Sequence, residues 1–356
     1  MKVLVTGGAG FIGSAFIRRF LAAGEGDVVN VDCLTYAANL PRLVGVAQDA
    51  RYTFVNADIR DGERMSEVLA ATRPHAIVHF AAESHVDRSI DSPAVFLQTN
   101  VVGTGALLEA AVRHWSAIAA GPGSDFRFLH VSTDEVYGDL GDTGAFDETS
   151  PYRPTSPYAA SKAASDHLAR AWQRTYGLPV IVTNTCNNYG PYQFPEKLVP
   201  LAILRARLGK SIPLYGDGTN VRDWIHVDDH ADALIAVLKR GRVGETYAIG
   251  ANETHTNRAV VEAICDAIDA IAGSGEHPTR GLITLVADRP GHDYRYALDP
   301  AKVMHEFGWR PSRSFADGLK QTVDWYLANE AWWRDILAGG YEAERLGLQG
   351  RTAAAR

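Results

Sequence analysis

The sequence has few cysteines, no long apolar run and no excess of positive charge, and each absence excludes a class of protein. Cys33, Cys186 and Cys265 are the only three cysteines in 356 residues, and their scattered spacing predicts reduced thiols rather than a disulfide framework. No apolar run approaches the roughly 20 residues that a membrane span needs. The net charge of −7 argues against a nucleic-acid binder and against adhesion to an anionic membrane. Because Met1 leads directly into the strand-like run KVLVTGG, we expect no signal peptide and a soluble cytoplasmic protein.

Short runs rich in Val, Ile and Leu alternate with helical patterns in the first half of the chain. The expected strands are Lys2–Thr6, Val28–Asp32, Tyr52–Val55, Ala76–Phe80 and Phe126–Ser132, and the expected helices lie around 13–23, 63–71, 93–115 and 157–176. This alternation, with fully apolar strands, indicates a parallel sheet that helices cover on both faces. The predicted fold class is α/β, with a Rossmann-type doubly wound parallel sheet.

A glycine-rich turn directly follows the first expected strand and opens the next helix. In VLVTGGAGFIG, Gly7, Gly10 and Gly13 let the backbone turn tightly and approach a pyrophosphate, which then meets the positive end of the helix. Asp32 ends the second strand about 20 residues further on, where an acid takes the adenosine ribose hydroxyls. Because a carboxylate there repels a 2′-phosphate, NAD is favoured over NADP. Asp58, after the third strand, is either an adenine contact or a simple turn acid.

Two further motifs carry reactive side chains. In YAASK, Tyr158 and Lys162 stand four residues apart, so they lie one above the other on a helix face. An ammonium beside a phenol lowers the phenol pKa, so that Tyr158 can exchange a proton with an alcohol hydroxyl. In VSTDEVYG, Asp134 and Glu135 follow Thr133 at the end of an apolar run. Since neighbouring side chains of a strand point to opposite faces, two acids of one site must lie where the strand stops.

Together, TGGAGFIG, STDEVYG and YAASK resemble the extended short-chain dehydrogenase/reductase superfamily. The resemblance narrows to the dTDP-glucose 4,6-dehydratases through FAAESHVDRSI, TNVVGT, CNNYGPYQFPEKLVPL, YGDGTNVRDWIHVDDH and DRPGHDYRYALD, and it runs from residue 1 to about 340. The chain departs from the common pattern at Gln193, where many members have His, and in TNTCNNYG, where TNCSNNYG or TRCSNNYG is commoner. Neither difference lies on the expected path of protons or hydride.

The resemblance implies loss of water across C5–C6 of dTDP-glucose, with NAD as the cofactor. The C5 proton becomes acidic only when C4 is a ketone, so Tyr158 would take the C4 hydroxyl proton while NAD accepts the C4 hydride. Glu135 would then abstract the C5 proton, and a protonated Asp134 would give its proton to the departing C6 hydroxyl. Return of the hydride to C6 and of a proton to C5 leaves a 4-keto-6-deoxy sugar. Thr133 and Lys162 complete the expected catalytic set.

The resemblance also implies contact residues for both ligands. Besides the three glycines, Asp32, Asp58, Tyr158 and Lys162, the expected cofactor contacts are Phe11, Ile12, Ile59, Ala81, Ala82, Thr99 and Asn188. The expected substrate contacts are Ser84, Thr133, Glu135, Asn187, Lys197, Leu198, Arg222, Asn257, Arg289 and His292, with Glu83 nearby and Tyr341 as a candidate for base stacking. Arg222 is the natural partner of the diphosphate, because a planar fork can bind phosphate oxygens in pairs.

The expected domains follow from these assignments. Residues 1–180 and about 225–250 form the predicted NAD-binding Rossmann domain, and 181–224 and about 251–345 form a smaller, interleaved nucleotide-sugar-binding domain. A frayed tail is expected over 346–356. The superfamily resemblance further implies a homodimer, in which the helices at 93–115 and 157–176 form a four-helix bundle.

Other functions stay open at this point. A 4-epimerase, or a dehydratase of a UDP-, GDP- or CDP-sugar, would use the same fold, although an epimerase should have small uncharged residues in place of Asp134 and Glu135. A non-enzymatic NAD sensor could lose its reactive side chains without harm, and all of them are present.

A metal site is not expected. His226 and His230 have the i, i+4 spacing of zinc-binding helices, but the general-base Glu of that motif is missing. Asp228 and Asp229 fit better as first-turn acids of a helix. Cys186 has no base beside it in this mechanism, and we expect it to pack. The pair Trp332–Trp333 is expected to pack as part of a late helix.

Overall fold

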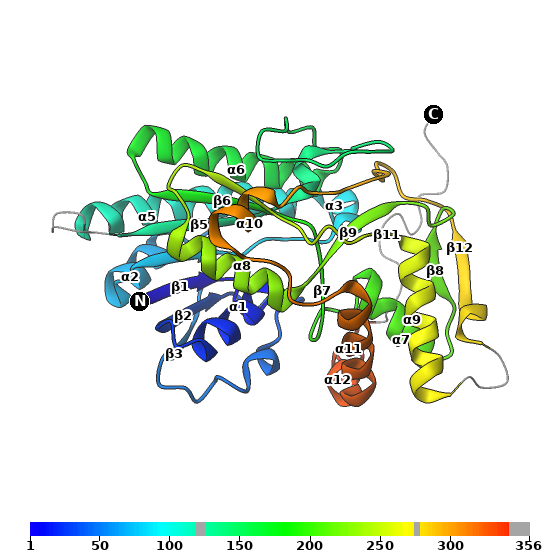
Figure 1. The fold of residues 1–356 in the computed structure, drawn as a ribbon. Helices are drawn as coiled ribbons and strands as arrows, with labels where there is room; N and C mark the ends of the chain where they lie inside the picture. The colour runs from blue at the N-terminus through cyan, green and yellow to red at the C-terminus, as the bar shows by residue number, and fades with distance from the viewer. Residues whose placement is uncertain (119–124, 274–277, 342–356) are drawn as a thin grey trace.

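A computed structural model describes residues 1–118, 125–273 and 278–341. Its centre is a seven-stranded, all-parallel sheet with the order β10-β6-β5-β4-β1-β2-β3 (Figure 1). The strands are β1 (Lys2–Thr6), β2 (Asp27–Asp32), β3 (Tyr52–Asn56), β4 (Ala76–His79), β5 (Arg127–Thr133), β6 (Val180–Thr185) and β10 (Thr246–Ile249). The strand order reverses between β1 and β4, as in doubly wound nucleotide-binding sheets. The predicted Rossmann-type α/β fold is confirmed.

Helices cover both faces of this sheet, because its inner strands are apolar on both sides. One face carries α1 (Phe11–Ala22) and α8 (Val227–Arg240), and the other carries α2 (Gly62–Thr72), α5 (Thr104–Ile118) and α6 (Pro157–Tyr176) (Figure 1). Separate hydrophobic clusters fill the two sides. Phe16 and Leu234 belong to the first cluster, and Leu69 and Leu107 belong to the second.

A second group of elements lies beyond the carboxyl ends of the sheet (Figure 1). It contains a sheet with the order β11-β9-β7 and the strand pair β12-β8. The strands are β7 (Asn187–Tyr189), β8 (Ile212–Tyr215), β9 (Val221–His226), β11 (Thr254–Thr256) and β12 (Ile283–Val286), and the helices are α7 (Leu198–Arg207), α9 (Asn257–Ala272), α11 (Phe315–Ala328) and α12 (Glu330–Ala338). A third hydrophobic cluster, which includes Trp224 and Trp333, fills the space between them.

Two features of this arrangement bear on the predicted domain limits. The limit after residue 180 falls at the start of β6, which belongs to the large sheet as far as Thr185. Helix α10 (Ala301–Phe307), which the prediction assigned to the smaller domain, packs against α8 and β10. The division into two domains stays a prediction. The predicted frayed tail, residues 346–356, lies outside the described residues.

The five predicted strands agree with the structure within one or two residues, whereas the helix predicted over 93–115 is interrupted. It consists of α4 (Pro93–Phe96), a π-helical turn η2 (Leu97–Gly103) and α5. An apolar pattern does not reveal a π-helical turn, which changes the hydrogen bonding rather than the composition. The remaining short elements are α3 (Val86–Asp91) and the 3₁₀ turns η1 (Leu40–Leu43), η3 (Asp134–Tyr137) and η4 (Thr279–Leu282).

The same interrupted helix corrects a second expectation. By length and composition alone, the stretch Pro93–Ile118 is apolar enough to cross a membrane, so the expectation that no segment approaches such a span is wrong. Part of its apolar surface packs inside the protein, where Phe96, Leu107, Leu108 and Ala111 are buried.

Candidate active site

A cavity of about 400 Å³ opens at the carboxyl ends of the parallel strands. Its walls come from the β1–α1 turn, the ends of β2 to β6, the start of α6 and residues 185–197. Ligands of doubly wound sheets bind at this edge, beside the point where the strand order reverses. The position of the cavity therefore suits a dinucleotide.

The turn between β1 and α1 can be formed only by small residues. Gly7 has a φ of +72°, and a Cβ atom there would lie 2.6 Å from the backbone nitrogen of Ala81. A Cβ atom on Gly13 would lie 2.4 Å from the carbonyl oxygen of Gly7. The turn therefore packs directly on the backbone after β4, and it leaves the cavity wall open to a ligand.

Gly7→Ala is expected to reduce both thermal stability and cofactor retention. The new side chain would collide with Ala81 and would also hold a left-handed backbone conformation, which alone costs on the order of 1–3 kcal/mol. Gly24→Ala is the matched control, because Gly24 has a φ of +69° with nothing within 4 Å of its added Cβ. Thermal unfolding and the cofactor content of the purified variants check the prediction. Equal behaviour of the two variants would contradict it.

The start of α1 and the end of β2 provide the two groups that a dinucleotide needs. No side chain among the described residues caps α1 at Gly10, so the N–H groups of its first turn stay available to a phosphate. The Asp32 carboxylate accepts hydrogen bonds from the N–H groups of Ala9, at 2.9 Å, and of Leu34, at 2.8 Å. Burial raises the Asp32 pKa, and these two donors oppose the increase. The free N–H groups suit the pyrophosphate of NAD, and the Asp32 carboxylate suits its adenosine ribose hydroxyls.

The acid pair lies where β5 ends. Thr133 is the last residue of the strand, and Asp134 and Glu135 begin η3, so both acids leave the alternation of the strand. The Thr133 hydroxyl accepts a hydrogen bond from the Glu135 N–H at 3.3 Å and donates one to Asp134 Oδ1 at 3.2 Å. Asp134 is 2% exposed, and no partner among the described residues reaches its Oδ2. Burial, followed by the charge of Glu135, holds the Asp134 pKa well above its ordinary value, which favours the protonated form.

Glu135 is less enclosed than Asp134 and faces three cations. Burial raises the Glu135 pKa, and the charges of Arg289, Lys197 and Arg222 oppose that increase. Of these three cations, Arg222 alone also opposes the increase at Asp134, where burial and the charge of Glu135 have larger effects, so the two neighbouring carboxyl groups have different environments. One favours the acid and the other favours the base, as an elimination requires.

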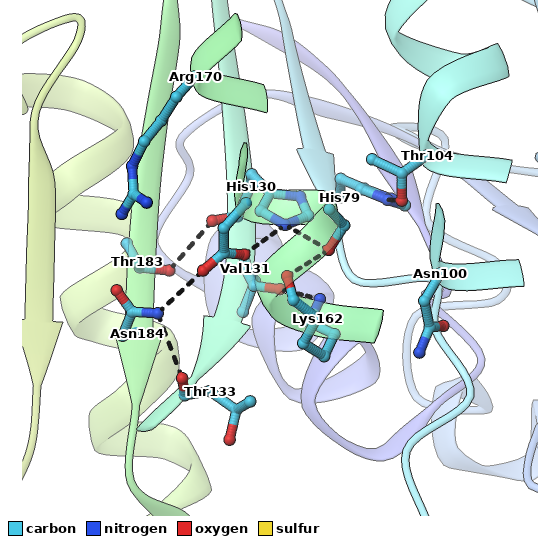
Figure 2. Close-up of polar contacts among 12 residues, drawn as sticks. His79, Asn100, Thr104, His130, Val131, Thr133, Lys162, Arg170, Thr183 and Asn184 are labelled. Carbon is cyan, nitrogen blue, oxygen red and sulfur yellow. Dashed lines mark hydrogen bonds and ion pairs between the residues drawn. The ribbon is translucent and has the colours of Figure 1, made fainter. Parts of the chain in front are cut away.

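Tyr158 and Lys162 lie one turn apart on α6, close to the end of β5. The Thr133 side chain acts on the Tyr158 phenol and lowers its pKa. The Lys162 ammonium donates to the carbonyl oxygen of Val131 at 2.9 Å (Figure 2). Burial lowers the Lys162 pKa to about 8. The expectation that the Tyr158 pKa is lowered is wrong for this structure: burial, followed by the charge of Glu135, raises it well above its ordinary value.

The cavity brings most of the predicted site residues together. It is lined by all the predicted catalytic and cofactor residues: Gly7, Gly10, Phe11, Ile12, Gly13, Asp32, Asp58, Ile59, Ala81, Ala82, Thr99, Thr133, Asp134, Glu135, Tyr158, Lys162 and Asn188. Five predicted substrate contacts line it as well: Ser84, Thr133, Glu135, Asn187 and Lys197. Five others do not: Leu198, Arg222, Asn257, Arg289 and His292.

The two arginines of this second group are held by protein groups. Arg222, on β9, is 4% exposed, and its guanidinium donates to the carbonyl oxygens of Asp293, at 2.9 Å, and Tyr294, at 3.1 Å. Arg289 forms an ion pair with Asp87 of α3 at 3.0 Å. Both charges nevertheless act on the pKa of Glu135, so they flank the acid end of the cavity.

The other three predicted substrate contacts that do not line the cavity lie at the start of a helix or in a loop. Leu198 is the first residue of α7, and Asn257 is the first residue of α9. The His292 imidazole forms a hydrogen bond with the Asp288 carboxylate at 2.6 Å. Burial lowers the His292 pKa to about 4.

The histidines of HVDDH have separate partners. His226 caps α8, where its Nδ1 accepts a hydrogen bond from the Asp228 N–H at 3.2 Å, and His230 Nδ1 bonds to Asn188 Oδ1 at 2.8 Å. Asp228 and Asp229 are first-turn acids of α8, as predicted. Among the described residues, no group of three His, Cys, Asp or Glu side chains is placed to hold a metal ion.

The remaining candidates lie in different surroundings. Cys186 is buried and lines the cavity, where burial, followed by the charge of Asp223, raises the pKa of its thiol. The Tyr341 ring lies 5.3 Å from the ring of Phe194, which lines the cavity. Trp333 is buried in the third hydrophobic cluster, and Trp332 packs against it from the same helix, α12.

Sequence reasoning missed Arg42, which lies in η1 and lines the cavity. Its guanidinium, which is almost fully buried, donates to the carbonyl oxygens of Ala9 at 2.9 Å, Ala37 at 2.6 Å and Tyr192 at 2.9 Å. It therefore joins the glycine turn to two other walls of the cavity. No motif marks Arg42, because its partners come from three separate segments of the chain.

Comparisons with known proteins agree with this site. The family model described as GDP-mannose 4,6 dehydratase matches residues 4–322. The chain is 55% identical, over 97% of its length and 99% of the relative, to a dTDP-glucose 4,6-dehydratase of Neisseria meningitidis serogroup B. It is 53% identical, over 96% of its length and 97% of the relative, to dTDP-glucose 4,6-dehydratase 1 of Escherichia coli K12.

Solved structures show the same relationship. DesIV, a dTDP-glucose 4,6-dehydratase of Streptomyces venezuelae crystallised with NAD, matches with a TM-score of 0.87 and 49% identity, over 94% of this chain and all of that one. A UDP-glucose 4-epimerase of Thermus thermophilus, also with NAD, matches with a TM-score of 0.81 but only 32% identity, over 92% of this chain and all of that one. The chain therefore belongs to the dTDP-glucose 4,6-dehydratase family.

Proposed function

We propose that the protein is a dTDP-glucose 4,6-dehydratase, which converts dTDP-glucose to dTDP-4-keto-6-deoxyglucose and water. The observation that carries this proposal is the acid pair at the end of β5, which shares one cavity with Tyr158 and Lys162. An epimerase needs the tyrosine and the lysine but eliminates nothing, so it has no use for a protonated Asp134 beside Glu135. The high identity to relatives named for this reaction supports the same conclusion.

The donor set at the β1–α1 turn supports NAD as the cofactor. Gly7, Gly10, Gly13 and the uncapped first turn of α1 would hold the pyrophosphate, and Asp32 would hold the adenosine ribose. When bound, NAD supplies the redox chemistry, taking a hydride from C4 and returning it to C6, and brings a cationic ring to the site.

Tyr158 acts first, on the C4 hydroxyl of the sugar. Oxidation of C4 requires this hydroxyl to lose its proton, and Tyr158 is the phenol that takes it, with the Thr133 side chain favouring its deprotonated form. A buried phenol with a raised pKa becomes a base only where positive charge surrounds it, so the nearby Lys162 ammonium is essential. The ketone formed at C4 makes the C5 proton acidic.

Glu135 and Asp134 then remove water across C5–C6. Glu135 takes the C5 proton, because the neighbouring cations favour its carboxylate form. Asp134 gives its proton to the C6 hydroxyl, because burial and the charge of Glu135 keep it protonated. The C6 oxygen leaves as water, and Glu135, whose proton exchanges with the solvent, protonates C5 at the end of the cycle. Tyr158 then releases the proton from C4 and Asp134 takes one up, which restores the starting protonation states. Arg222 is assigned to the nucleotide diphosphate, and Lys197 and the remaining predicted contacts are assigned to the nucleotide-sugar as a whole.

Mass spectrometry of the purified protein, incubated with dTDP-glucose or with UDP-glucose, tests the proposal. The expected result is loss of one water from dTDP-glucose over many turnovers with no NAD consumed. Water loss from UDP-glucose alone would keep the mechanism and change the assigned nucleotide from dTDP to UDP. Thymine and uracil differ by one methyl group, and a contact of that size separates two substrates by only about 10- to 200-fold. An unchanged mass of both sugars, in protein that contains NAD, would contradict the hexose assignment.

We also propose that the enzyme is a cytoplasmic homodimer, formed through α4, η2, α5 and α6. Large apolar side chains stay exposed on these elements: Leu97 and Val102 are 51% and 53% exposed, and Tyr176 of α6 is 53% exposed. Two copies of this surface would form a four-helix bundle and bury these side chains. The unpaired cysteines, of which Cys33 is exposed, support a reducing compartment.

Leu97→Glu is expected to convert the dimer to a monomer, because two copies of the charge would enter an apolar interface. Light scattering at equal protein concentrations measures the mass of each variant. Val44→Glu is the matched control, since Val44 is 71% exposed but lies outside these helices. A single-chain mass for the unmodified protein, or no change of mass with Leu97→Glu, would contradict the proposed interface.

A further inference from the structure

A third charged side chain extends the reactive column of α6. Tyr158, Lys162 and Asp166 follow one another at four-residue spacing, so they share one face of the helix. Asp166 is fully buried and does not line the cavity. A carboxylate is rarely buried unless paired groups hold it there, so its partners are informative.

The Asp166 carboxylate is held by three groups, from β5, from the loop before α6 and from β6. Its Oδ1 bonds to His130 Nε2 of β5 at 3.0 Å. Its Oδ2 accepts hydrogen bonds from the Tyr152 hydroxyl at 2.7 Å and from the Asn184 amide of β6 at 3.2 Å. The same Asn184 amide lies 3.2 Å from the carbonyl oxygen of Thr133, so the carboxylate is linked to the strand end that carries the acid pair (Figure 2).

Lys162 is held by a backbone group rather than by a salt bridge. Its ammonium donates to the Val131 carbonyl oxygen, and within the described parts of the chain no carboxylate lies within ion-pair distance of it. Among those residues, Asp166 is the carboxylate whose charge acts on it. Tyr158 lies one turn away on the same helix face. The other titratable groups coupled to the Lys162 charge are Asp166 on its own helix, His79 on β4 and His130 on β5, and Figure 2 labels the two histidines. Burial, supported by the Lys162 charge, lowers the pKa of both histidines, so both are neutral at neutral pH.

Asp166 is the remaining charge. Burial opposes its ionised form, but the hydrogen bond from His130 and the Lys162 ammonium outweigh that effect, and the Asp166 pKa is lowered. Burial lowers the Lys162 pKa to about 8, and the charge of Asp166 is the influence that opposes this decrease. Each member of the pair therefore favours the charged form of the other.

We propose that Asp166 is a positioning residue whose buried carboxylate keeps Lys162 charged and, through Asn184, fixes Thr133 at the end of β5. The inference rests on the proposed function, because only proton transfer by Tyr158 gives the Lys162 charge a task. Since the folded pKa of Lys162 is about 8, its ammonium is present below that pH and is lost as the pH rises through it.

Asp166→Asn in the NAD-containing enzyme tests the inference through the pH profile of kcat/KM. The alkaline limb of the unmodified enzyme should fall near pH 8. In Asp166→Asn it should move down by about one pH unit, the lower end of the effect of a close opposite charge. Tyr152→Phe is the matched control, because it removes a hydrogen bond to the same carboxylate and keeps the charge of Asp166. The alkaline limb of its kcat/KM profile should stay at the pH of the unmodified enzyme.

Thermal unfolding and cofactor content report whether each variant folds. If Asp166→Asn does not fold, Asp166→Ser carries the same expectation and leaves room for water beside His130 and Tyr152. An alkaline limb at the same pH in the unmodified enzyme and in the neutral variants would overturn the role of Asp166 while leaving the dehydratase intact. Absence of water loss in the unmodified enzyme would instead overturn the proposed function.

Discussion

Glu135→Gln should form the C4 ketone but fail to dehydrate it. The amide keeps the size of the side chain and removes the base that takes the C5 proton, so kcat for water loss should fall by about 10²- to 10⁴-fold. Burial and three nearby cations act on the pKa of this carboxyl group. An amide in the same surroundings cannot take the C5 proton. Rapid mixing with dTDP-glucose, followed by the absorbance of the reduced cofactor, should show a signal that persists.

Exchange of the C5 hydrogen with deuterated water separates this role from a general disturbance of the site. The unmodified enzyme should incorporate deuterium at C5, and Glu135→Gln should not. Glu83→Gln is the matched control, because Glu83 lines the same cavity and burial also raises its pKa. Its dehydration rate should stay within about tenfold of the unmodified enzyme, well short of the loss expected for a general base. Dehydration by Glu135→Gln at an unchanged rate would show that another group takes the C5 proton.

Tyr158→Phe should stop the reaction one step earlier. The substitution removes only the phenol oxygen that takes the C4 hydroxyl proton, and the loss of kcat/KM should again be about 10²- to 10⁴-fold. In contrast to Glu135→Gln, no absorbance of the reduced cofactor should appear on rapid mixing, because C4 is never oxidised. Tyr137→Phe controls for the loss of a buried hydroxyl, since the Tyr137 hydroxyl bonds to Asn184 at 3.2 Å and not to the reacting groups. Reduced cofactor in Tyr158→Phe at the normal rate would contradict the assignment.

Short sequence patterns predicted the strands and the motifs whose residues are close together in the chain. The strands β1 to β5 are short runs rich in apolar residues, so their positions could be predicted within one or two residues. The glycine turn, Asp32, the acid pair and the Tyr158–Lys162 pair all lie where such a strand ends or on one helix face, and all of them line the cavity.

Features that depend on distant segments could not be predicted in the same way. Arg222 and Arg289 were assigned to the substrate, but the sequence does not show that Arg222 is bound by carbonyl oxygens and Arg289 by Asp87. The Tyr158 pKa was expected to decrease, because the spacing shows Lys162 and does not show burial or the approach of Glu135. Burial outweighs a neighbouring charge here.

Asp166 lies between these two cases. The four-residue spacing from Lys162 to Asp166 is visible in YAASKAASD, yet it suggested no chemistry. The partners of Asp166 lie on β5 and β6, and only the order of the sheet brings them to α6. Spacing on one helix could therefore have identified the residue, whereas its role follows from the fold.

The fate of the hydrogen on C4 tests the central claim most directly. Incubation of the enzyme with dTDP-glucose that carries deuterium at C4, followed by nuclear magnetic resonance of the product, locates that atom. We expect the deuterium to appear at C6, in the new methyl group, and the hydrogen at C5 to come from the solvent. Deuterium lost to water, or deuterium that stays at C4 in a product that has lost water, would contradict an internal transfer and with it the proposed reaction.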